Sequence, residues 1–128
     1  MSNLDHFEQI GDRGFYRPVG AVTFDQAVEM VARAMVNARN AGCMELLVNV
    51  CGLTGFPPPT IFARYGLAVR WAESAGSTLR VAMVAPAALI DPEKIGVLMA
   101  QNRGVTGDVF TSEVAAIAWL DSRGSAGT

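Results

Sequence analysis

Short apolar runs mark four segments of the chain as β-strands: residues 15–22, 44–50, 79–85 and 105–110. In the second segment side chains point alternately to two faces, of which one is wholly apolar and the other is mixed. The apolar face has Met44, Leu46, Val48 and Val50, and the mixed face has Glu45, Leu47 and Asn49. The third segment repeats this alternation with Leu79, Val81 and Met83. We therefore expect strands that are covered heavily on one face and lightly on the other.

A hairpin is predicted near the N-terminus. The apolar run at residues 7–10 is separated from residues 15–22 by Gly11 to Gly14, a turn-rich tetrapeptide of the kind that joins two antiparallel strands. Thr23 follows, with Gln26 at the spacing of a capping box, so a first helix should begin there. One face of this helix is apolar, with Phe24, Ala27, Val28, Val31, Met35 and Ala38.

Three more helices follow in the periodic pattern. The second is predicted from Pro59 or Thr60 to Ala75, with a narrow core stripe of Ile61, Tyr65, Ala68 and Ala72. An acid followed by proline at 91–92 predicts the start of the third, which should end near residues 103–104. Thr111 and Ser112 cap the last, which runs through Leu120. The elements alternate as strand and helix, which predicts one mixed sheet in an α/β domain over residues 1–121, followed by a flexible tail, 122–128.

Composition narrows the class of protein. Of the 128 residues, 51% are hydrophobic and 17% are charged, and the formal net charge is −2 without a basic tract. Nucleic acid and anionic membranes are therefore poor partners. The N-terminus lacks the pattern of a signal peptide, and no run of about 18 apolar residues occurs, so we expect a cytoplasmic protein without membrane insertion. Cys43 and Cys51 bracket a predicted strand, which would place them about 26 Å apart and beyond disulfide reach, so we expect free thiols.

The sequence offers no recognisable catalytic, metal or cofactor site. His6 is the single histidine, so a catalytic triad or a multi-histidine metal site is not expected. The Gly52-to-Gly55 segment lacks the pattern of a phosphate loop. A hydrolase or transferase that uses Thr54, Thr60 or Cys51 as nucleophile would lack an identifiable base.

A binding edge is more plausible than a catalytic centre, because residues 51–60 join a strand's carboxyl end to a helix N-terminus, where ligands often meet α/β proteins. The candidate binding residues on this segment are Cys51, Thr54, Phe56 and Thr60. On the second helix, Leu67 and Trp71 form an apolar stripe beside the predicted core seam, with Arg64 one turn before Leu67. This stripe could pack into the core beside the main seam, or it could form a surface that binds a partner.

The order of elements, together with the ending Val109-Phe110-Thr111-Ser112, then alanines and Trp119-Leu120 on a short helix, resembles the SpoIIAA-like (STAS/SEC14-like) bacterial family. The resemblance covers roughly residues 6–120, and the strands Leu-Leu-Val-Asn and Val-Ala-Met-Val-Ala support it. It implies a single mixed β-sheet of four to five strands with about four helices packed mainly on one face.

The resemblance also implies a non-enzymatic regulatory module, since the better-known relatives are anti-sigma-factor antagonists regulated by phosphorylation. Their second helix opens with an Asp-Ser-Ser-Gly-like segment that carries the phosphoacceptor. This chain has Pro57 to Thr60 there, so Thr60 is the phosphoacceptor candidate, and Asn49 stands where many relatives end the central strand with Asp.

Two functions follow from these observations. The first is a regulatory or protein-interaction module that binds a protein partner or itself, as a homodimer with Trp71 or Leu67 at the interface. The alternative is SEC14-like binding of a lipid or small apolar ligand in an adaptable cavity lined by Met30, Met35, Met83 and Met99.

Overall fold

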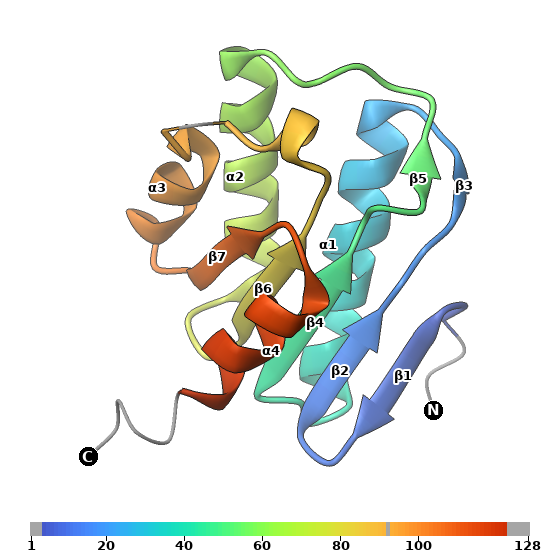
Figure 1. Cartoon of the computed structure of the whole chain (residues 1–128). Helices are drawn as coiled ribbons and strands as arrows, with labels where there is room; N and C mark the ends of the chain where they lie inside the picture. The colour runs from blue at the N-terminus through green and yellow to red at the C-terminus, as the bar shows by residue number, and fades with distance from the viewer. Residues whose placement is uncertain (1–3, 92, 123–128) are drawn as a thin grey trace.

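The computed structural model describes residues 4–91 and 93–122. Five strands form one mixed sheet in the order β1-β2-β4-β6-β7, in which β1 and β2 are antiparallel and the other neighbours are parallel (Figure 1). The strands are β1 (Phe7–Ile10), β2 (Arg13–Tyr16), β4 (Glu45–Asn49), β6 (Arg80–Val84) and β7 (Thr106–Phe110). A two-stranded parallel ribbon joins β3 (Gly20–Ala21) to β5 (Leu53–Thr54).

Helices follow the strands throughout the described residues: α1 (Phe24–Asn40), α2 (Ile61–Ala75), the short 3₁₀ helix η1 (Ala87–Leu89), α3 (Ile95–Gln101) and α4 (Glu113–Asp121). One face of the sheet is covered by α1, α2 and α3, and the other by α4 (Figure 1). The predicted fold class is therefore confirmed.

Alternation along β4 divides the interior between the two faces. Leu46 and Val48 face the larger core, where they pack with Met35 of α1, while Leu47 faces the opposite side and packs with Leu120 of α4. All five side chains are at most 1% exposed. The central strand is buried on both faces, as expected for a parallel strand in the middle of an α/β sheet.

Two details of the strands differ from prediction. Residues 15–22 do not form one strand, because Pro18 has no N–H to continue the ladder and Gly20 has a φ of 133°. Met44 was expected on the apolar face, but it is 47% exposed because the β4 strand begins only at Glu45.

The hairpin and the start of α1 are confirmed. Ile10 pairs with Arg13, so the turn is shorter than the predicted tetrapeptide. At α1, the Thr23 hydroxyl accepts the N–H of Gln26 at 3.1 Å, and the Gln26 side-chain oxygen accepts the N–H of Thr23 at 2.9 Å. This reciprocal pair is the predicted capping box.

Helix α2 begins and ends as predicted but faces a different way. Thr60 is its N-cap, and its hydroxyl accepts the N–H of Ala63 at 3.1 Å. The predicted core stripe is wrong in two places, since Ile61 is 62% exposed and Tyr65 is 48% exposed, although Ala68 is fully buried. The cause is that α2 packs mainly against α1 and α3 and makes few contacts with the strands.

Helix α3 is shorter than predicted. The Asp91 carboxylate accepts backbone N–H groups, including that of Ile95 at 3.1 Å, and so builds a turn instead of capping a helix directly. Lys94 then adopts a left-handed conformation with a φ of 53°, and the helix runs only from Ile95 to Gln101. Pro92 lies outside the described residues.

The last helix is confirmed with nearly the predicted bounds. The Ser112 hydroxyl accepts the N–H of Ala115 at 3.2 Å, and α4 ends at Asp121, one residue beyond the predicted end. Of the predicted tail, residues 123–128 lie outside the described residues.

Candidate functional site

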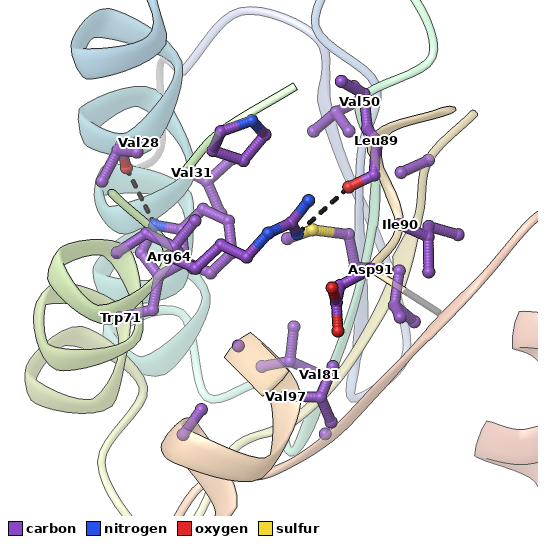
Figure 2. A pocket seen from close by; sticks show the side chains of 18 of the residues that line it. Val28, Val31, Val50, Arg64, Trp71, Val81, Leu89, Ile90, Asp91 and Val97 are labelled. Carbon is purple, nitrogen blue, oxygen red and sulfur yellow. Dashed lines mark hydrogen bonds between the residues drawn. The ribbon is translucent and has the colours of Figure 1, made fainter. Parts of the chain in front are cut away.

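An apolar pocket of about 160 Å³ lies between the sheet and the three helices on its larger core face. Strands β6 and β7 provide part of its floor, and α1, α2, η1 and α3 provide its walls (Figure 2). Representative lining residues are Val31, Met35, Leu67, Val81, Met83 and Val97.

The pocket exists because α2 stands off the sheet. Its principal neighbours are α1 and α3, so the helix bridges those two elements above the strands. Part of the wall that faces α2 has small residues, since α3 contributes Gly96 and Ala100 to it. A gap that neighbouring side chains are too short to fill remains open in an otherwise close-packed interior.

Trp71 forms one wall of the pocket. Its indole Nε1 donates a hydrogen bond to the carbonyl oxygen of Val28 on α1 at 3.0 Å, and Figure 2 shows this bond between the two facing helices. Leu67, one turn earlier on α2, lines the same space. Of the two interpretations that the sequence left open for this stripe, the structure favours inward packing.

Charged side chains interrupt the apolar lining at four positions: Arg64, Asp91, Lys94 and Asp108. Lys94 Nζ lies 2.9 Å from Asp108 Oδ1 in a salt bridge. Arg64 Nη1 donates to the carbonyl oxygen of Leu89 at 3.2 Å. The pocket therefore combines a mostly apolar interior with a few fixed polar groups, which is the usual character of a small-molecule site.

The structure brings together four of the seven residues predicted from the sequence: Phe56, Arg64, Leu67 and Trp71 all line the pocket. Phe56 also packs edge-on against Phe24, with ring centroids 5.9 Å apart. Cys51, Thr54 and Thr60 do not line it and are exposed on the segment that leads from β4 to α2.

Cys51 has the environment of an ordinary thiol. It is one of two free cysteines in the described residues, as predicted, and it is exposed. Partial burial, and secondarily the nearby Glu113 carboxylate, raises the pKa of this thiol above its usual value. A raised pKa lowers the thiolate fraction at neutral pH, so this site does not favour nucleophilic chemistry.

A second polar cluster lies at the carboxyl end of β4, on the face covered by α4. Arg17 Nε lies 2.8 Å from Glu113 Oε2, and Asn49 Nδ2 donates to the same oxygen at 2.8 Å. The Asn49 side-chain oxygen accepts the N–H of Cys51 at 2.9 Å. An Asp at position 49 would place a second carboxylate beside Glu113, which explains why a neutral amide suits this position.

Sequence reasoning missed the part of the wall that η1 and α3 supply, such as Leu89, Ile90 and Val97. The signal available was weak, because these residues lie in or beside short elements with little periodicity. Of the four methionines expected to line a cavity, Met35 and Met83 do so, whereas Met30 and Met99 are not among the lining residues.

Comparison with known proteins adds no assignment: no family model matches the sequence, and no curated protein matches it. Among the described residues, no group of three or more His, Cys, Asp or Glu side chains is arranged to hold a metal ion. No helix within the described ranges is long and apolar enough to cross a membrane.

Proposed function

We propose that this chain is a non-enzymatic module that binds a small apolar ligand between α2 and the sheet. The observation that carries the proposal is the apolar pocket of about 160 Å³, with Trp71 as part of its wall. An apolar cavity of about 150 Å³ accepts a molecule such as benzene, so the space suits one ring or a short chain. The resemblance to the SEC14-like relatives supports the same class of function.

The size of the pocket also limits the ligand. A drug-sized site is usually about 300 to 1,000 Å³, well above the volume observed. A whole phospholipid would therefore exceed the space, whereas a compact ring or a chain of a few carbons would fit it. The binding energy would come from burying apolar surface, at roughly 25 cal/mol per Å².

Titration calorimetry with 3-phenylpropan-1-ol tests this proposal. The blocking variant is Gly96→Leu, because a Cβ built at Gly96 lies 3.7 Å from the Cβ of Arg64 and so enters the space between α3 and α2. The matched control is Gly66→Leu, which adds the same atoms at a position where a Cβ meets nothing within 4 Å. We expect wild type and Gly66→Leu to bind and Gly96→Leu to lose at least tenfold in affinity. If wild type bound neither this alcohol nor the carboxylic acid of the same ring and chain at millimolar concentration, the proposal would be refuted.

A second candidate is the protein-interaction module predicted from the sequence, with a second copy of the chain as partner. The exposure of Phe62, at 89%, and of Ile61, at 62%, favours it, since both lie in the first turn of α2 directly after the predicted binding edge. Sedimentation of wild type and Phe62→Ser at micromolar concentration tests it. The proposal expects a wild-type dimer that the variant weakens, and a wild-type monomer would exclude it.

A further inference from the structure

The charged side chains that line the pocket restrict which apolar molecules it can hold. A charge facing apolar surroundings is costly unless it has a partner. The partners of Arg64, Asp91, Lys94 and Asp108 therefore indicate which of these groups the fold itself uses and which is available to a ligand.

The fold engages three of the four. Lys94 and Asp108 form the salt bridge at 2.9 Å and cancel each other's charge. Asp91 Oδ2 accepts the backbone N–H groups of Glu93 at 3.0 Å and Ile95 at 3.1 Å, so this carboxylate holds the turn before α3. These contacts are structural and would be present with or without a ligand.

Arg64 is different. Its side chain reaches from α2 across the pocket towards Leu89 (Figure 2), and its one hydrogen bond within the described residues goes to that neutral carbonyl oxygen. No carboxylate in the described part of the chain forms an ion pair with it. The guanidinium group has five N–H donors in a planar fork. Most of its donors, and its charge, therefore have no protein partner within the described residues.

We propose that Arg64 binds the carboxylate of the ligand, and that the ligand is a small carboxylic acid with an apolar body. The inference rests on the proposed function and specifies its ligand. A planar guanidinium matches a carboxylate through two parallel hydrogen bonds, which are stronger than bonds between neutral groups. The apolar body would lie beside Leu67 and Trp71. The other cation of the lining, Lys94, is already paired with Asp108.

The negative charge of Asp91 should weaken binding of the acid, and a substitution at this residue can test that effect. Its carboxylate lines the same pocket, so its negative charge repels an acid. In Asp91→Asn the side-chain oxygen still accepts the two N–H groups while the charge is removed. We therefore expect this variant to bind the acid severalfold more tightly than wild type does.

Two probes with the same ring and chain isolate the carboxylate: 3-phenylpropionate and 3-phenylpropan-1-ol, each titrated calorimetrically at pH 7. We expect wild type to bind the acid at least tenfold more tightly than the alcohol. In Arg64→Gln the affinity for the acid should fall to the level of the affinity for the alcohol. The affinity for the alcohol should change by less than twofold. Arg33→Gln removes a charge from the exposed face of α1 and should keep the wild-type preference.

The outcomes separate this inference from the proposed function. Equal binding of both probes to wild type overturns the role of Arg64 but leaves an apolar binding site. A preference for the acid that persists in Arg64→Gln also overturns it, because another cation must then hold the carboxylate. No binding of either probe overturns both proposals. If Arg64→Gln does not fold, Arg64→Met decides: it keeps an unbranched apolar side chain without the charge, and acid affinity equal to wild type would contradict the proposal.

Discussion

Glu45 is a fully buried carboxylate, 1% exposed, at the start of the central strand. Arg13 Nε lies 2.8 Å from it and Arg80 Nη1 lies 3.5 Å away. Arg80 also donates to the carbonyl oxygen of Leu120 at the end of α4, and its guanidinium lies 4.3 Å from the ring centroid of Trp119. Arg13 reaches the same helix, since its Nη2 lies 2.8 Å from Asp121 Oδ1. Glu45 thus fixes two arginines, both of which hold α4 against the sheet.

Removing this carboxylate should cost much of the stability. Loss of Glu45 leaves Arg80 without a carboxylate partner among the described residues and Arg13 with Asp121 alone, so Glu45→Ala should lower the free energy of unfolding by about 3 to 5 kcal/mol. Urea unfolding followed by circular dichroism measures the change. Glu73→Ala, on the exposed face of α2, is the control and should stay within about 0.5 kcal/mol of wild type. A loss below about 1 kcal/mol in Glu45→Ala would contradict this account.

At the scale of elements, the start of α2 depends on one hydroxyl. Thr60 caps the helix through its bond to the Ala63 N–H, and it is also the phosphoacceptor candidate. Because the side chain is exposed, it can be replaced without disturbing a core. The effect of a substitution there therefore reports the cap alone.

Thr60→Ala should lower the free energy of unfolding by about 1 kcal/mol, since one N–H at the helix end loses its acceptor. Thr60→Ser keeps the hydroxyl and should match wild type within a few tenths of a kcal/mol. Thermal unfolding of the three proteins gives the comparison. Identical midpoints for Ala and Ser would mean that solvent replaces the cap at no cost.

The elements were more predictable than the site. The sequence patterns that predicted the elements involve residues close together in the chain. Examples are the capping box of Thr23 and Gln26 and the alternation in β4, and both elements formed as expected. The orientation of α2 is a tertiary property, because the helix packs against two other helices. Ile61 was therefore assigned to the core although it is exposed, and the position of Trp71 was left open. The pocket arises from that same orientation, so no local pattern could indicate it.

At the scale of the whole molecule, Glu113 links α4 to the sheet. Hydrogen bonds from Arg17, and then from Asn49, hold the pKa of this carboxyl below its ordinary value of 4.5. The folded protein therefore binds the proton less readily than the unfolded chain does. The stabilisation is complete above the unfolded pKa and is lost as the pH falls through the lower, folded pKa.

The free energy of unfolding should consequently fall as the pH is lowered below about 4.5, and Glu113→Gln should reduce that dependence. The wild type should be more stable than the variant at pH 7, and the difference should shrink towards pH 3. Urea unfolding across this range measures both curves, with the exposed Glu73→Gln as the matched charge control. A difference that stays constant with pH would show that titration of Glu113 contributes nothing.

Helix α2 packs on α1 and α3 and makes few contacts with the strands. This arrangement affects how fast a ligand can enter and leave the pocket as well as how much room it has. Lifting this helix would break its contacts with α1 and α3 but leave the strand pairing of the sheet intact, so such a local opening would cost less free energy than unfolding of the whole domain. The residence time of a molecule in the pocket would then be governed by how often α2 lifts. Substitutions in the pocket lining would then change the affinity for the ligand. Substitutions at the contacts of α2 with α1 and α3 would change the rate at which the ligand exchanges.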